Sequence, residues 1–298
     1  MRVFLTGATG FIGSAIIPEL IGAGHAVLGL TRSDEGAKAL AALGVEPHRG
    51  SLEDPDSLRA GAARADGVIH CAYDHNFTTF VENSEKDARA IEAMGAALAG
   101  SDRPLIVSAG ITPFTPGRPT TEDDDAPEQS MVPRVSEQVA MALRAKGVSA
   151  AVVRLPQVHD TTKHGLVSLM IATAREKGVS GYVGDGTGRW PAAHVSDVAR
   201  LYRLALDKHV AGARYHAVGE EGVPLKDIAE TIGRGLKIPV VSIAQEDALA
   251  HFGFVGQLAG RDAPASSSLT RQRLGWRPAG PGMIADLQQM DYASAAGG

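Results

Sequence analysis

The sequence holds a single cysteine, Cys71, among 298 residues. One thiol excludes a disulfide framework and any metal site built from several cysteines, and it fits a reducing compartment. No run of about 18 apolar residues is present, so we expect no membrane span. The first apolar run, Val3 to Leu5, is far too short for the core of a signal peptide. We therefore expect a cytoplasmic protein.

An excess of positive charge is also missing. The chain has 29 Lys and Arg residues against 34 Asp and Glu residues, a formal net charge of −5, and its basic residues are scattered. Nucleic-acid binding requires a basic patch or stripe, so we expect a small-molecule substrate and no nucleic-acid partner. The densest charge run, residues 122–125, is acidic, and we interpret it as a solvated loop.

Short apolar runs alternate with amphipathic segments along much of the chain. The expected strands are residues 3–5, 26–30, 45–48, 67–71, 105–108, 150–155 and 215–218. The main helices expected around them are 12–21, 34–43, 79–99, 131–146, 165–177 and 196–208. Continuous apolar strands separated by helices predict an α/β fold with a parallel sheet covered on both faces. We assign residues 1–155 to a core to which 190–220 return, and 156–189 and 221–298 to a smaller lobe.

A glycine-rich turn, TGATGFIG at residues 6–13, follows the first expected strand and opens the first expected helix. Gly7 permits a tight turn, Gly10 lets the backbone approach a pyrophosphate, and Gly13 lets the helix pack closely on the strand. Free N–H groups at the start of a helix favour an anion. The other residues expected to contact a dinucleotide on this turn are Thr9, Phe11 and Ile12. The alternative is a purely structural turn.

The end of the second expected strand bears on the choice of cofactor. An acidic residue there would bind the ribose 2′-hydroxyl of NAD. The strand instead ends in Thr31, Arg32 and Ser33. Arg32 can pair with the 2′-phosphate of NADP, and Thr31 or Ser33 can donate a hydroxyl hydrogen bond. The pattern favours NADP over NAD, and the alternative is that Asp34 binds the ribose.

Three segments together resemble the short-chain dehydrogenase/reductase superfamily. They are TGATGFIG at 6–13, DGVIHCAY at 66–73 and WPAAHVSDVARLY at 190–202. They are most similar to its extended or atypical branch, related to the NAD-dependent epimerase/dehydratases, over roughly residues 1 to 220. The resemblance implies a Rossmann doubly wound parallel sheet of about seven strands, a smaller C-terminal substrate lobe, and a monomer or homodimer.

The resemblance also implies positions around the cofactor. Ser51 and Leu52, after the third strand, would lie near the adenine. Ala72, past the fourth strand, would lie beside the cofactor, and Leu155 and Pro156 would lie near the nicotinamide.

The chain departs from the family where the chemistry is usually found. Members usually carry a serine or threonine after the fifth strand and Tyr-x-x-x-Lys on the next helix, where the tyrosine moves the proton and the lysine lowers its pKa. Here Ser108 or Ala109 falls at the serine position, and Pro133 and Glu137 stand where tyrosine and lysine are expected. No tyrosine or lysine lies between residues 110 and 146. The usual mechanism therefore does not carry over, and we expect Glu137 to pair with Arg134 or Arg154.

Polar residues that follow the fourth and sixth strands can replace the missing acid, because ligands bind at the carboxyl ends of such strands. Tyr73 or His75 can give a proton to a carbonyl oxygen during hydride transfer, and Asp74 or Asp160 can orient a histidine. The catalytic candidates are Tyr73, His75, His164 and Ser108. For each histidine the alternative is a structural hydrogen bond.

A metal site is not expected. His159, Asp160 and His164 are close in sequence, but their spacing matches no zinc signature.

The pattern as a whole favours an NADP-dependent reductase of a small carbonyl, imine or activated alkene. One alternative is a non-catalytic NADP-binding sensor or regulatory protein, which the loss of the tyrosine and lysine would fit. A nucleotide-sugar epimerase or dehydratase ranks last, because that chemistry depends most on the absent tyrosine.

Overall fold

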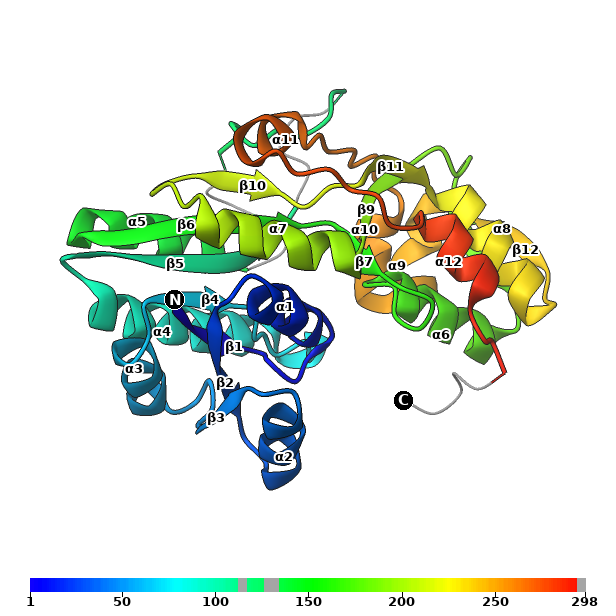
Figure 1. Ribbon diagram of the computed structural model, residues 1–298. Helices are drawn as coiled ribbons and strands as arrows, with labels where there is room; N and C mark the ends of the chain where they lie inside the picture. The colour runs from blue at the N-terminus through cyan, green and yellow to red at the C-terminus, as the bar shows by residue number, and fades with distance from the viewer. Residues whose placement is uncertain (112–116, 126–133, 294–298) are drawn as a thin grey trace.

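A seven-stranded parallel sheet forms the centre of the computed structural model, which describes residues 1–111, 117–125 and 134–293 (Figure 1). Its strand order is β10-β6-β5-β4-β1-β2-β3. The strands are β1 (Arg2–Thr6), β2 (Ala26–Thr31), β3 (Glu46–Arg49), β4 (Gly67–His70), β5 (Ser101–Gly110), β6 (Val148–Leu155) and β10 (Arg214–His216). The order reverses between β1 and β4, and such sheets bind ligands at this reversal, beyond the carboxyl ends of the strands. The predicted Rossmann sheet is confirmed.

Helices cover both faces of the sheet because its strands are buried on both sides. One face is packed by α1 (Phe11–Gly22), α2 (Asp34–Ala42) and α7 (Val195–Asp207). The other is packed by α3 (Pro55–Ala63), α4 (Phe80–Leu98) and α5 (Ser136–Ala142). Each set shares one apolar cluster with the strands, so the sheet separates two layers of core.

The smaller lobe lies at the right of Figure 1 and has an apolar core of its own. Its helices are α6 (Val167–Lys177), α8 (Leu225–Leu236), α9 (Ala248–Phe252), α10 (Gly256–Ala259) and α12 (Met283–Gln289), with the strand pair β8 (Ser180–Val183) and β12 (Val240–Ile243). A three-stranded sheet of β7 (Gln157–His159), β9 (Arg189–His194) and β11 (Glu220–Pro224) lies beside it. Short 3-10 helices are η1 (Phe77–Thr79), η2 (Leu143–Lys146), η3 (Gln245–Asp247) and η4 (Gly253–Val255).

Part of the segment that we predicted for the lobe packs on the Rossmann core instead. Helix α11 (Ser268–Leu274) lies against β10 and α7. Trp276 is fully buried in the cluster around α1 and α7, and its indole N–H donates to the Asp197 carbonyl oxygen at 2.9 Å. Burial of this large side chain attaches the segment around Trp276 to the Rossmann core, although the segments before and after it belong to the smaller lobe.

The helix expected over residues 131–146 is shorter in the described part of the chain. Helix α5 begins at Ser136 and ends at Ala142, and a 3-10 turn completes it. Pro133 lies outside the described residues. No helix within the described ranges is long and apolar enough to cross a membrane.

Candidate functional site

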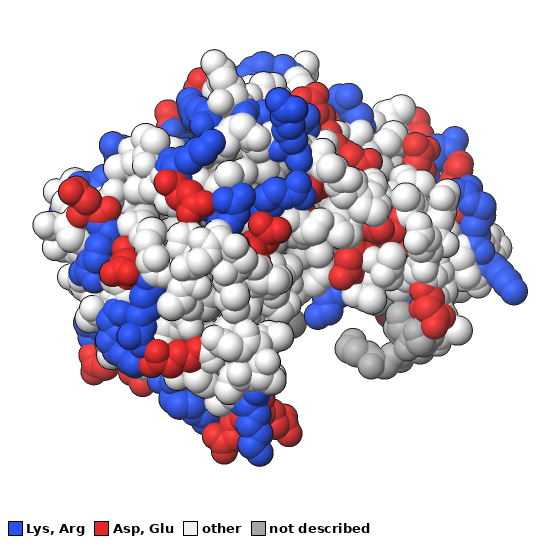
Figure 2. Space-filling model, in the orientation of Figure 1, with Lys and Arg blue, Asp and Glu red and all other residues white. Residues whose placement is uncertain are grey.

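A cleft of about 1390 Å³ lies between the carboxyl ends of the central strands and the C-terminal lobe. Figure 2 shows this face hollowed between the part that carries α2 and the part that carries α6. Its walls run from the glycine turn after β1 to residues of α6 and of the segment 254–263. Small-molecule pockets typically measure about 300–1,000 Å³, so the cleft has room for a dinucleotide and a substrate together.

The glycine turn has the shape that a pyrophosphate needs. Gly7 has a φ of +68°, and a Cβ there would lie 2.8 Å from the backbone nitrogen of Ala72. A Cβ on Gly13 would lie 2.0 Å from the Gly7 carbonyl oxygen. Helix α1 begins at Phe11 with no side chain capping it, which leaves first-turn N–H groups for an anion. These residues fit the phosphate part of a dinucleotide.

The cleft collects nearly all the residues expected around a cofactor. Those that line it are Gly7, Thr9, Gly10, Phe11, Ile12, Gly13, Thr31, Arg32, Ser51, Leu52, Ala72, Leu155 and Pro156. Ser33 is the exception: its hydroxyl caps α2 by accepting from the Gly36 N–H at 3.0 Å.

Lys86 is a cleft residue that sequence reasoning did not single out. Its ammonium lies 2.9 Å from a Glu53 carboxylate oxygen and 3.1 Å from one of Asp74. Hydrogen bonds and charge from Lys86 lower the pKa of Glu53. The lysine thus links α4 to the loops after β3 and β4, along the adenine side of the predicted site. Asp74 holds this lysine and is not placed to orient a histidine.

A buried chain of hydrogen bonds lies beneath the cofactor cradle. Ser136 donates to Asp87 at 2.5 Å, Asp87 lies 2.9 Å from Nε2 of His70, and Nδ1 of His70 lies 2.7 Å from the Thr6 hydroxyl. That hydroxyl accepts from the Ala72 N–H at 3.2 Å. Burial raises the pKa of Asp87, but His70 and its other partners outweigh this and leave the pKa below its ordinary value. The chain fixes the ends of β1 and β4, where the cofactor turn begins.

Tyr73, His75 and Arg134 form a polar group in the cleft, beside the end of β4. The Arg134 guanidinium carbon lies 4.2 Å from the centre of the Tyr73 ring, and the Tyr73 and His75 rings meet edge to face at 5.2 Å. The Tyr73 hydroxyl oxygen is buried, whereas the His75 side chain is exposed in the cleft. Loss of hydration next to the surrounding protein lowers the pKa of His75, and the positive charge of Arg134 lowers it further.

Ser108 does not line the cleft. Its side chain is buried, donates to the His70 carbonyl oxygen at 2.7 Å and lies 2.6 Å from the Tyr202 hydroxyl. These contacts hold the Ser108 side chain between β4, β5 and α7. In the described part of the chain, its hydroxyl does not face the cleft.

His164 also lies behind the cleft wall. It is fully buried, and neither ring nitrogen has a hydrogen-bond partner among the described residues. Asp160, the carboxylate expected to orient a histidine, instead accepts from the N–H groups of Thr162 and Lys163. Burial, followed by the charge of nearby His159, lowers the pKa of His164 to about 4. His164 therefore belongs to the interior and stays neutral at pH 7.

This burial predicts acid sensitivity. His164 takes up a proton near pH 6.5 when unfolded but only near pH 4 when folded, so stability is lost as pH falls from about 6.5 to 4. The free energy of unfolding should drop by about 2 kcal/mol between pH 7 and pH 5 from this residue alone. Urea titrations of the wild type and His164→Gln at both pH values measure it. An equal drop in both proteins would contradict this assignment.

Glu137, which we expected where the family usually has lysine, points into the protein rather than the cleft. It is buried, and its carboxylate accepts from Arg154 at 2.6 and 2.8 Å and from Arg214 at 2.8 Å. Of the two partners expected from the sequence, Arg154 is confirmed and Arg134 is wrong, because Arg134 bonds to Ser136. Glu137 holds α5 to β6 and β10.

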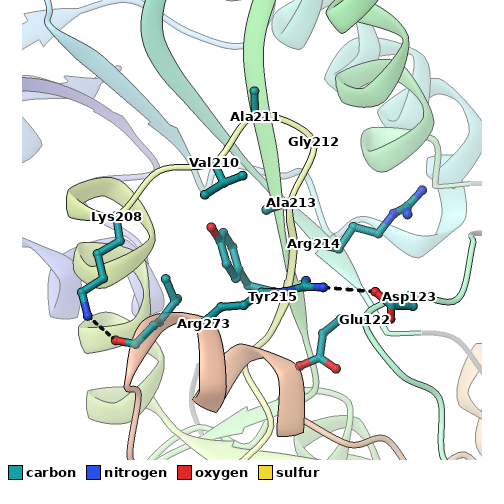
Figure 3. Close-up of a pocket in the computed structure, with 11 residues that line it drawn as sticks. Glu122, Asp123, Lys208, Val210, Ala211, Gly212, Ala213, Arg214, Tyr215 and Arg273 are labelled. Carbon is teal, nitrogen blue, oxygen red and sulfur yellow. Dashed lines mark hydrogen bonds and ion pairs between the residues drawn. The ribbon is translucent and has the colours of Figure 1, made fainter.

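A second hollow of about 350 Å³ lies at the edge strand β10 (Figure 3). Its cations are already held: Lys208 donates to the Leu274 carbonyl oxygen at 2.8 Å, and Arg273 lies 3.2 Å from Asp123. We assign no ligand to it.

Glu122, which also lines this hollow, corrects our interpretation of the acidic run as a solvated loop. The residue is buried, and one carboxylate oxygen accepts from both the N–H and the hydroxyl of Thr270 at 2.6 Å. These two bonds fix the start of the acidic run to α11.

Comparisons with known proteins agree with this geometry. The model of the NAD dependent epimerase/dehydratase family matches residues 3–218. An uncharacterized protein of Schizosaccharomyces pombe is 45% identical over 294 residues, which are 98% of this chain and 100% of that protein.

More distant relatives carry named activities. A Stigmatella aurantiaca 4-hydroxy-2-methyl-3-oxo-4-farnesyl-3,4-dihydroquinoline-1-oxide ketoreductase is 25% identical over 335 residues, covering 100% of this chain and 97% of that protein. The solved UDP-glucose 4-epimerase of Thermotoga maritima, with UDP-glucose, has a TM-score of 0.76 at 18% identity and covers 98% of this chain and 97% of its own. The latter likeness shows the fold alone.

Proposed function

Because the chain belongs to the NAD-dependent epimerase/dehydratase family of short-chain dehydrogenase/reductase enzymes, we propose that it is an NADP-dependent reductase of a small carbonyl, imine or activated alkene. It would work without a Tyr-x-x-x-Lys pair. The observation that carries the proposal is a single cleft that joins the glycine turn to His75, Tyr73 and Arg134. The likeness to a ketoreductase over the whole chain supports reduction as the reaction.

The surroundings of Arg32 support NADP as the cofactor. Arg32 lines the cleft, and no carboxylate of the described residues lies within ion-pair distance of it. Asp34, the alternative ribose ligand, does not line the cleft; it is exposed and lies 3.4 Å from Arg49. A guanidinium here pairs well with a 2′-phosphate.

Arg32→Ala is expected to weaken NADPH binding by about 10- to 100-fold, the loss of a charge-assisted contact, and to leave NADH affinity within about threefold. Nicotinamide fluorescence titrations with both cofactors measure this, and Asp34→Asn, expected to change neither affinity, serves as the control. Equal losses of affinity for NADPH and NADH would contradict the role of Arg32 in binding the 2′-phosphate.

The proton in this reaction is assigned to His75. When bound, the reduced nicotinamide supplies a hydride to the electrophilic carbon of the substrate. His75 donates the proton to the carbonyl oxygen or imine nitrogen, so one C–H bond and one O–H or N–H bond replace the π bond. With an activated alkene, the proton goes to the other alkene carbon and two C–H bonds replace the π bond. Tyr73 is not placed for this donation because its hydroxyl oxygen is buried, and its ring supports Arg134 instead.

This assignment predicts a pH profile. The pKa of His75 is lowered by its surroundings, so its protonated fraction grows only as pH falls below about 6.5, the ordinary value. Turnover should therefore rise as the pH falls through this range, as general-acid catalysis requires. His75→Gln should remove this rise in turnover at low pH and lower turnover by about 100-fold while leaving NADPH affinity unchanged. A mutant that keeps the wild-type profile would show that another group supplies the proton.

One observation favours a second candidate, a non-catalytic NADP-binding sensor. Glu137, which we expect at the position of the family lysine, is a buried carboxylate engaged by two arginines and does not line the cleft. Cofactor binding without turnover on any substrate would identify that role.

A further inference from the structure

The substrate half of the cleft is bounded by apolar and aromatic side chains from both lobes. Phe80 of the core stacks on Phe254 of the lobe, with ring centres 5.6 Å apart and planes 23° apart. Trp190, Leu166 and Leu169 line the same cleft. Walls of this kind take up hydrocarbon or aryl groups, and the few polar groups among them orient the ligand.

Arg134 is the cation placed among these walls. Its Nε donates to the Ser136 hydroxyl at 2.9 Å, and its Nη2 donates to the Ser108 carbonyl oxygen at 3.1 Å. The Tyr73 ring supports the guanidinium from one side. These contacts orient Arg134 firmly, but every one of these partners is neutral.

Asp87 bonds to Ser136 behind Arg134, and the charge of Arg134 contributes to lowering the pKa of Asp87, but the described residues give Arg134 no direct ion pair. No carboxylate among them lies within 4 Å of it, whereas Lys86, another cation of the cleft, has two carboxylate partners. A half-buried guanidinium held in place by neutral acceptors is ready to bind an anion with little loss of its own freedom.

We propose that Arg134 binds the carboxylate of the substrate, and that the substrate is an oxo acid with an apolar or aromatic tail. Arg134 and His75 both contact the Tyr73 ring, so the carboxylate and the carbonyl would be held close together. The tail would lie along Phe80 and Phe254. This inference rests on the proposed reductase function, because it assigns the substrate of the same site.

Binding, not turnover, tests it. The protein is saturated with NADP⁺, which cannot reduce a ketone, and titrated calorimetrically with 4-phenyl-2-oxobutanoate and with its ethyl ester. The acid is expected to bind the wild type about 10- to 100-fold more tightly than the ester, the effect of one charge-assisted pair. Arg134→Gln should bring the two affinities together, and Arg134→Lys should retain part of the preference.

The outcomes separate this inference from the reductase proposal. If acid and ester bind the wild type alike, if neither binds, or if Arg134→Gln keeps the preference, the carboxylate role is overturned. A protein that shows the preference but never oxidises NADPH would keep the anion site while losing the reductase function. NADP⁺ affinity and thermal unfolding of each variant show that the fold and cofactor site remain intact.

Discussion

Replacing Glu137 with lysine, the residue that the family resemblance leads one to expect there, is expected to cost about 3–5 kcal/mol of unfolding free energy or more. The new ammonium would lie in a buried site beside Arg154 and Arg214, which now share the carboxylate. Arg154 is fully buried and also donates to the Asp124 carbonyl oxygen at 2.7 Å. Losing its counter-ion would leave an uncompensated charge between β6 and the segment that covers it.

Glu137→Gln is the matched control, because it keeps the shape and removes the charge. It should cost less than the lysine variant, since the amide oxygen still accepts a hydrogen bond. Urea unfolding of the three proteins gives the order wild type, glutamine, lysine. A lysine variant within about 1 kcal/mol of the wild type would mean that residue 137 reaches solvent or the cleft, contrary to the carboxylate–arginine cluster.

Gly13→Ala is expected to lower NADPH affinity by about 100-fold or more. The added Cβ would lie 2.0 Å from the carbonyl oxygen and 2.7 Å from the carbonyl carbon of Gly7. Backbone atoms cannot move aside cheaply, so α1 must shift away from the turn where we propose that the pyrophosphate binds. Correct positioning within about 1 Å matters at such a site.

Gly22→Ala supplies the control within the same helix. A Cβ on Gly22 meets no atom of the described residues within 4 Å, so this variant should bind NADPH like the wild type and gain about 0.5–1 kcal/mol of stability, as glycine is a poor helix former. Of the two alanine variants, only Gly13→Ala is thus expected to weaken NADPH binding. Normal binding by Gly13→Ala would show that the helix does not need to lie so close to the strand.

The elements that the sequence predicted well are those marked by residues within the element itself or directly beside it. The run of Gly7, Gly10 and Gly13 marks a turn whose backbone demands are local, and Gly7 has the positive φ of +68° that such a turn needs. Apolar runs between helices were enough to predict the parallel sheet.

The features that sequence missed depend on contacts between distant segments. Arg134 meets Tyr73 across 61 positions of chain, and the His70–Asp87 bond joins a strand to a helix. His164 lies next to cleft residues in sequence, yet its ring is turned into the interior. The position of a histidine in the sequence does not reveal whether its ring faces the cleft or the interior, because packing decides which side of a loop faces a ligand.

The most direct test of the central claim is a nicotinamide fluorescence titration with NADPH and NADH, followed in the same cuvette by ketone, imine and enone substrates. The account predicts that NADPH binds at least about 10-fold more tightly than NADH and is oxidised by at least one substrate. Tight NADPH binding with no oxidation across the whole panel would contradict the reductase and leave the sensor as the function of this cleft.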